Sequence, residues 1–133
     1  MTAPSSPDNV ALVVAAHPDD GDFGAAGHGL LLTARGWQVH FLICTNGAKG
    51  TEDRKMSRER LIATRHEEQR EACRRMGVAS VHFLDHEDGE LVYERQFLEQ
   101  VVRAIRTIRP HTILTHDPTD IIIPDGASSD NLT

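Results

Sequence analysis

The sequence predicts an α/β fold: a Rossmann-like unit with three layers, in which a mainly parallel sheet has helices on both faces. Four short apolar runs, rich in β-branched residues, alternate with three segments of helical periodicity. Such runs are typical of strands buried on both faces of a parallel sheet. The connections between them are long enough for right-handed crossovers. A chain of 133 residues has the size of one domain.

The predicted strands lie near residues 10–16, 37–45, 80–85 and 111–116. The first of them, VALVVAA, is followed at once by charged residues and glycines. An uninterrupted apolar run with a polar boundary favours a strand over a helix, because buried helices need a longer run.

The three predicted helices differ in their signals. Residues 23–35 combine helix-forming Leu and Ala with a stop at Gly36. The second pattern runs from Ser57 to Gly77 with helical spacing. The third repeats apolar residues every three or four positions over 97–108, and Pro110 terminates it. Each helix therefore has a chemical reason to end where its pattern ends.

The domain organisation and compartment follow from composition. Residues 1–9 are predicted to be a disordered lead-in, and residues 10–133 a single domain. There are 14 basic and 20 acidic residues, with no block of like charge, which argues against nucleic acid or an anionic membrane as a partner. No secretory signal and no long apolar stretch is present. We therefore expect a soluble cytoplasmic protein with a small-molecule partner, in which Cys44 and Cys73 are buried, reduced thiols.

Two polar clusters follow predicted strands, namely HPDD (residues 17–20) and THDP (residues 115–118). If the strand order is 3-2-1-4, the chain reverses between strands 1 and 4, and ligands should bind beyond the carboxyl ends of these two strands. The assumed order therefore brings both clusters to the same crevice.

Two phosphate-binding interpretations fit this crevice poorly. Gly21, Gly24 and Gly27 do not give the G-x-G-x-x-G spacing of dinucleotide sites, and charged side chains stand where backbone amides should meet the pyrophosphate. An aspartyl phosphotransferase would need a lysine at a strand end, whereas the two lysines, Lys49 and Lys55, lie in a loop.

A divalent metal site of the hydrolytic kind fits better. Zinc binds imidazole nitrogen and carboxylate oxygen, so His17 and Asp20 are candidate ligands, and Asp19 between them is a candidate general base. The competing interpretation is a solvated turn in which Asp20 or Asp22 caps the following helix. The spacing alone leaves both open.

Four segments in order resemble one family. The chain contains AAHPDDGDFGAAG, TNGAKGTED, RHEEQREACRRMGVASVHFLDHEDGEL and IRPHTILTHDP, which together look like the LmbE-like or PIG-L family of zinc-dependent N-deacetylases and amidases. The similarity runs from about residue 10 to residue 118. It implies a Rossmann-like fold and removal of an acyl group from an N-acylated amino sugar, such as an N-acetylglucosaminyl conjugate.

The resemblance also implies roles for individual residues. His17 and Asp20 match ligands of a single zinc ion, and Asp19 matches the general base that acts on the zinc-bound water. Arg65, in an R-x-x-E pattern, and Asp88, before a glycine, match positions near the sugar.

The chain departs from the family pattern in two places. Gly21 replaces the glutamate of A-H-P-D-D-E, and no H-P-D-H follows T-H-D-P, so the family's third zinc ligand has no match. His116 is a possible substitute, because the assumed strand order places it opposite His17; the alternative is that it lines the crevice.

The missing motif keeps a second function open, a non-catalytic binding or interaction module, or an inactive fragment, that retains the crevice. The chain lacks the C-terminal part of the family, and its tail contains DIIIPDG. An uncovered sheet edge and consecutive isoleucines favour association, so we expect a homo-oligomer.

Overall fold

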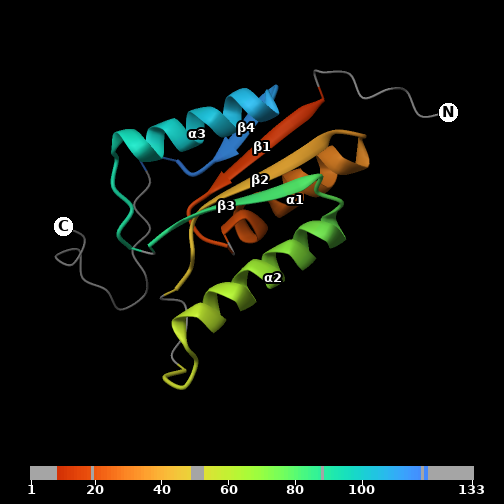
Figure 1. Ribbon diagram of the computed structural model, residues 1–133. Coiled ribbons are helices and arrows are strands. Elements are labelled where there is room, and N and C mark those ends of the chain that lie inside the picture. The colour runs from red at the N-terminus through yellow and green to blue at the C-terminus, as the bar shows by residue number, and fades with distance from the viewer. Residues whose placement is uncertain (1–8, 19, 49–52, 88, 118, 120–133) are drawn as a thin grey trace.

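The structure is a computed structural model that describes residues 9–18, 20–48, 53–87, 89–117 and 119, with the backbone alone over 20–26. Strands and helices alternate along the whole of this part of the chain (Figure 1). In chain order they are β1 (Val10–Ala15), α1 (Asp20–Ala34), β2 (Gln38–Thr45), α2 (Arg58–Met76), β3 (Ser80–His86), α3 (Arg95–Ile108) and β4 (Thr112–Thr115).

The four strands form one parallel sheet in the order β3-β2-β1-β4. Val13 of β1 is paired with Phe41 of β2 on one side and with Leu114 of β4 on the other. The predicted order, 3-2-1-4, is therefore confirmed. The carboxyl ends of β1 and β4 are neighbours, as a binding crevice at the reversal point requires.

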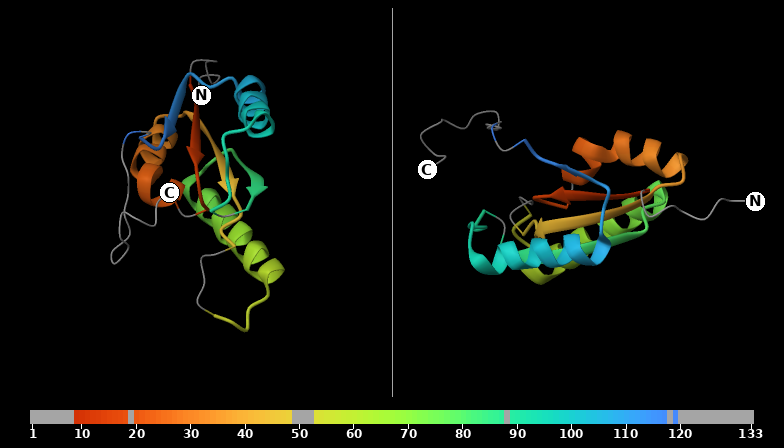
Figure 2. Two further views of the ribbon diagram at one scale, coloured as in Figure 1. Left: turned by 90° about the vertical axis from the view of Figure 1, so that its left-hand side faces the viewer. Right: turned by 90° about the horizontal axis from the view of Figure 1, so that it is seen from above.

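Helices cover both faces of the sheet, and α1 and α3 lie on opposite sides of it (Figure 2). On the α1 and α2 face, the core contains Val13, Phe41 and Ile43, packed with Cys73 of α2 and Leu32 of α1. Alternate strand residues point the other way. Leu12 and Leu42 are buried on the α3 face, at 0% and 1% exposure.

Helix ends follow the predicted capping signals. Ser57 is the N-cap of α2 and accepts a hydrogen bond from the Arg60 amide. Gly77 ends the same helix with a φ of 74°, in the left-handed region that glycine adopts without strain. The end of α3 at Arg109 directly precedes Pro110, as the sequence indicates.

The observed bounds differ from the predicted ones mainly in α1. The strands agree within one residue at either end, but α1 begins at Asp20 and not at Phe23. Acidic residues are favourable in a first helical turn, because the amide groups there carry partial positive charge. The polar residues 20–22 therefore belong to the helix and not to the turn before it.

β3 contains an irregularity near its carboxyl end. Its register against β2 shifts between Ile43 and Thr45, and Asp85 there has a φ of 57°. His66 of α2 donates a hydrogen bond from Nε2 to Asp85 Oδ1 (2.7 Å) and stacks on Phe83. Side chains, and not the strand ladder alone, therefore hold the end of β3.

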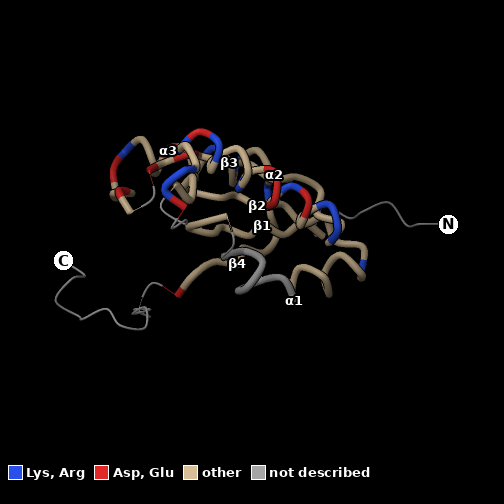
Figure 3. The backbone as a smooth tube through the Cα atoms, turned by 90° about the horizontal axis from the view of Figure 1, so that it is seen from below, with Lys and Arg blue, Asp and Glu red and all other residues tan. Residues whose placement is uncertain are grey.

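Both cysteines are buried and neither forms a disulfide among the described residues, as predicted. Burial raises the pKa of the Cys44 thiol to about 11. No helix in the described part of the chain is long and apolar enough to cross a membrane. Along α2 and α3, acidic and basic residues are interspersed (Figure 3). The predicted lead-in, apart from its last residue, and the DIIIPDG tail lie outside the described residues.

Candidate active site

The candidate site is built around Ala16, the residue between β1 and His17. Its amide N–H donates to His116 Nε2 at 3.1 Å. Its carbonyl oxygen accepts from both the backbone amide and the hydroxyl of Thr45, each at 2.8 Å. Both peptide groups of Ala16 are thus held by the neighbouring strand ends. His17, which follows directly, is exposed.

His116 lies beside the end of β1, as the predicted strand order requires. Its Nε2 already accepts the Ala16 amide, and a nitrogen lone pair used in this way does not also bind a metal ion. This contact favours the crevice-lining role of His116 over the role of substitute ligand. The neighbouring Asp117 accepts hydrogen bonds from the amide and hydroxyl of Thr119, which lower the pKa of its carboxyl group.

Gly47 brings three segments of the site together. It has a φ of 66°, and a Cβ atom built on it would lie 3.1 Å from Pro18 Cδ and 3.8 Å from Arg65 Cγ. Pro18 itself is buried. The glycine of the TNG loop therefore allows the segment after β1, the loop after β2 and helix α2 to meet.

Arg65 is the predicted sugar contact whose side chain is described. Its guanidinium group donates to Glu68 at 3.0 Å, so the R-x-x-E pattern is an ion pair within α2. The Arg65 side chain is 25% exposed and borders Gly47. Arg65 therefore lies at the site, where part of its charge is balanced by Glu68.

A second group of contacts joins β2 to the loop after β3. Asn46 is 3% exposed, and its Nδ2 donates to Glu87 Oε1 at 2.9 Å. Glu87 also forms an ion pair with Arg58 at the start of α2. Our sequence reasoning missed Thr45 and Asn46. Thr45 ends the predicted strand and Asn46 begins the predicted glycine-rich loop, so the available signal was a polar pair at the carboxyl end of a buried strand.

The remaining predicted site residues fall outside what the structure describes. Asp19 and Asp88 are not described, and of Asp20 only the backbone is, in the first turn of α1. Among the described residues, no three His, Cys, Asp or Glu side chains come together as a metal site. Of the two predicted zinc ligands, His17 is the one whose side chain is described, and its imidazole nitrogen is of the type that zinc prefers.

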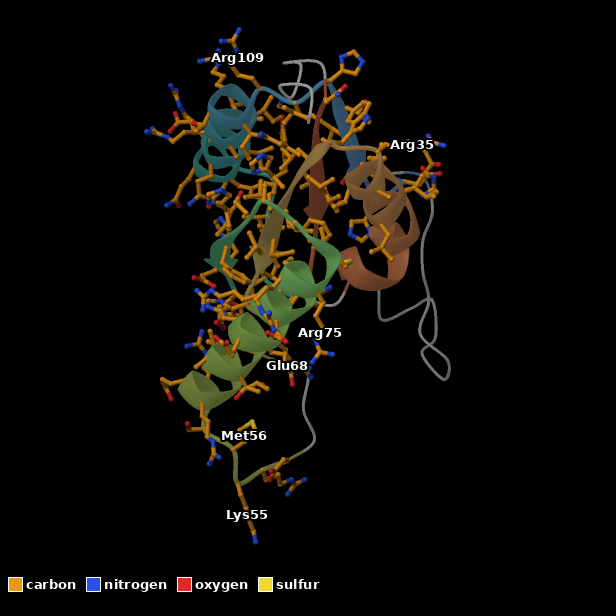
Figure 4. The ribbon with its side chains drawn as sticks, turned by 90° about the vertical axis from the view of Figure 1, so that its right-hand side faces the viewer. Arg35, Lys55, Met56, Glu68, Arg75 and Arg109 are labelled. Atoms are coloured by element: carbon orange, nitrogen blue, oxygen red, sulfur yellow. The ribbon has the colours of Figure 1, made fainter. Side chains whose placement is uncertain are left out.

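The phosphotransferase alternative gains nothing from the structure. Lys55 lies before α2 and extends away from the body of the molecule (Figure 4). A lysine in that position does not reach the carboxyl ends of the strands.

With this geometry established, comparison with known proteins decides the family. The family model "PIG-L: GlcNAc-PI de-N-acetylase" matches residues 12–129. The chain belongs to the PIG-L family. The resemblance drawn from the four sequence segments is confirmed.

Two curated PIG-L relatives carry deacetylase names. The chain is 37% identical over 107 residues to a diacetylchitobiose deacetylase of Thermococcus kodakarensis, covering 80% of this chain and 40% of that protein. It is 33% identical over 119 residues to a probable N-acetyl-α-D-glucosaminyl L-malate deacetylase of Bacillus cereus, covering 86% and 54%. The chain thus spans about half the length of these relatives.

Solved structures confirm the fold. The N,N'-diacetylchitobiose deacetylase of Pyrococcus horikoshii, in complex with its inhibitor MPG, superposes with a TM-score of 0.82 and 30% identity, over 92% of this chain and 45% of that one. The 4-carboxy-2-hydroxymuconate hydratase GalB of Pseudomonas putida gives 0.76 and 27%, over 84% and 50%. Because a hydratase shares this fold, the reaction has to be argued from site residues.

Proposed function

We propose that this chain is a zinc-dependent N-deacetylase, which hydrolyses the amide of an N-acylated amino sugar or a related conjugate. The observation that carries the proposal is the exposed His17 directly after Ala16, whose peptide groups are held by Thr45 and His116. Deacetylase names among the PIG-L relatives support the reaction class.

In this proposal, His17 and Asp20 hold one zinc ion. Asp20 belongs to the first turn of α1, three positions after His17, with buried Pro18 between them. Zinc, when bound, supplies a Lewis acid that lowers the pKa of a bound water toward about 7. A carboxylate in the first turn of α1 would interact favourably with the zinc ion and with the partial positive charge of the helix N-terminus.

Asp19 is the proposed general base, which takes the proton of the attacking water. Arg65 and Asp88 are proposed to contact the sugar. The guanidinium group of Arg65 offers several donors in one plane, which suits the hydroxyl and carbonyl oxygens of an acylated sugar. Its pairing with Glu68 fixes the orientation of that plane.

A second function, a non-catalytic binding module that keeps the crevice, is favoured by one observation. The family's third ligand motif has no match after T-H-D-P, and His116 Nε2 is engaged by the Ala16 amide. Two protein ligands with two waters hold zinc more weakly than three.

Zinc content separates the two functions. We expect about one zinc ion per purified chain, lost in His17→Ala and Asp20→Ala, by elemental analysis of dialysed protein. The matched control is His28→Ala, because His28 is an exposed histidine on α1. Unchanged zinc binding by Asp20→Ala would show that the ligand assignment is wrong, and a zinc-free wild-type chain would favour the binding module.

A further inference from the structure

Asn46 is a buried polar residue whose side-chain oxygen and nitrogen each form a hydrogen bond. Its Oδ1 accepts the Ala48 amide at 3.0 Å, and its Nδ2 donates to Glu87 Oε1 at 2.9 Å. The two partners fix the orientation of the amide, because an amide N–H requires an acceptor and a carboxylate requires a donor. Its backbone N–H donates to the His86 carbonyl at 3.0 Å. Asn46 thus contacts both the loop after β2 and the end of β3.

Glu87 is the partner that extends this contact. Its carboxylate accepts from Asn46 and is paired with Arg58 of α2. Its backbone carbonyl accepts the Glu90 amide at 3.0 Å, which closes the turn after β3. A single side chain therefore connects this turn to both β2 and α2.

The end of β3 needs such a connection, because its ladder to β2 is irregular there. The register shift and the left-handed Asp85 interrupt the ladder, so that Thr45–His86 is the one regular pair between the irregularity and the following loop. Asn46 is also adjacent in sequence to two residues of the candidate site, Thr45 and Gly47. Thr45 holds Ala16, and Gly47 lies against Pro18.

We propose that Asn46 is a positioning residue, which holds the loop after β3, through Glu87, at a fixed place relative to the His17–Pro18 segment. Its consequence for the reaction rests on the proposed function, in which Asp88, next to Glu87, contacts the sugar. Because the contact is one hydrogen bond between two loops, its loss should loosen the loop after β3, which Arg58 still contacts through Glu87, and leave the sheet intact.

Amide exchange of the 133-residue chain, measured by NMR, tests the contact itself. Asn46→Asp keeps an oxygen for the Ala48 amide but places a carboxylate against Glu87. We expect the Glu90 amide to exchange about fivefold faster, with Ala48 unchanged. The Arg109 amide, bonded to Ile105 at the end of α3, reports any global effect and should not change.

Glu87 variants provide the matched pair. Glu87→Gln keeps the acceptor oxygen and should retain the wild-type Glu90 rate, whereas Glu87→Ala should reproduce Asn46→Asp. The Glu87 side chain is 34% exposed, so its truncation tests the same bond if Asn46→Asp does not fold. A Glu90 amide that exchanges at the wild-type rate in Glu87→Ala would overturn the proposal.

Sugar affinity then tests the role of the contact. In zinc-loaded protein titrated with N-acetylglucosamine, Asn46→Asp should weaken binding about fivefold at unchanged zinc content. Wild-type affinity for N-acetylglucosamine in a variant whose Glu90 amide exchanges faster would overturn the positioning role. A wild-type chain that holds zinc but does not bind the sugar would contradict the proposed function, and the exchange rates alone would then decide whether Asn46 holds the loop.

Discussion

Gly47 shows how a single residue shapes the site. Its φ of 66° favours glycine, and the space beside it is occupied by Pro18, with a Cβ position 3.1 Å from Pro18 Cδ. Gly36 has a similar conformation, with a φ of 84°, but its Cβ position has no atom within 4 Å. A substitution at Gly36 therefore tests the left-handed conformation alone, whereas a substitution at Gly47 tests that conformation together with the contact with Pro18.

We predict that Gly47→Ala destabilises the protein more than Gly36→Ala. The Gly36 change should cost about 1 kcal/mol for the left-handed conformation alone. Gly47→Ala should add about 1 kcal/mol from the contact with Pro18 and weaken zinc binding, because Pro18 lies between the two proposed ligands. Urea unfolding and zinc titration measure both effects. Equal losses in the two variants would show that the contact with Pro18 has no effect.

His40 lies in β2, outside the candidate site, and should make the stability of the protein depend on pH. Burial, followed by the nearby His82, lowers the pKa of His40, whose Nδ1 is 2.6 Å from Ser80 Oγ. A lowered pKa means that the unfolded chain binds the proton more readily. The contribution of His40 to stability is therefore full above its unfolded pKa of 6.5 and falls as the pH drops below that value.

We predict that His40→Asn loses less stability than the wild type between pH 7.5 and pH 5.5. Asparagine retains a polar group near Ser80 but has no titrating proton. Urea unfolding at the two pH values gives the comparison within each protein. The same loss in both proteins would exclude His40 as a source of the pH dependence.

The roles of single residues were predictable where a motif is local. The local motif HPDD is sufficient to predict His17 as a site residue. Asn46 was not predictable in this way, since its partner Glu87 is 41 residues away and follows an irregular strand end. The role of Gly47 likewise depends on Pro18 of another segment.

At the level of elements, the hydrophobic patterns were sufficient for the architecture. Alternation of buried runs and helical periods predicted the four strands and three helices, whereas the strand order was assumed and agrees with the observed order β3-β2-β1-β4. The start of α1 was three residues wrong, because the polar residues after β1 were assigned to a turn, whereas acidic residues are favourable in a first helical turn. The irregularity at Asp85 is accompanied by a tertiary contact with His66, which no local pattern contains.

We predict that Ser57→Ala destabilises the protein by about 1 kcal/mol, because the Arg60 amide loses its acceptor at the N-terminus of α2. The matched control is Glu94→Ala at the N-cap of α3, where no side chain accepts a capping hydrogen bond. Thermal and urea unfolding should show almost no change for this control. A loss in both variants would mean that the capping bond does not explain the effect.

At the level of the whole molecule, the described surface includes apolar side chains near the start of α3. Val92, Tyr93 and Leu98 are 58%, 84% and 43% exposed. β3 and β4 are also the outer strands of the described sheet. Exposed apolar side chains and outer strands both favour contact with another chain.

We therefore predict self-association at micromolar concentration, with a light-scattering mass above the 14.7 kDa of one chain. The double variant Tyr93→Ser and Leu98→Gln should reduce that mass. A wild-type mass of one chain would contradict the prediction, and an unchanged mass in the double variant would place the contact elsewhere.

The proposed function connects the three scales. The parallel sheet brings the carboxyl ends of its strands together. The end of β2 and the loop after it contact Ala16 and Pro18, on either side of His17, and Asp19 is the proposed base. Release of acetate from N,N'-diacetylchitobiose by the zinc-loaded chain, compared with Asp19→Asn, tests this most directly. We predict release by the wild type and a rate at least about a hundredfold lower in the variant, at equal zinc content. No acetate from zinc-loaded wild type, or equal rates from both proteins, would contradict it.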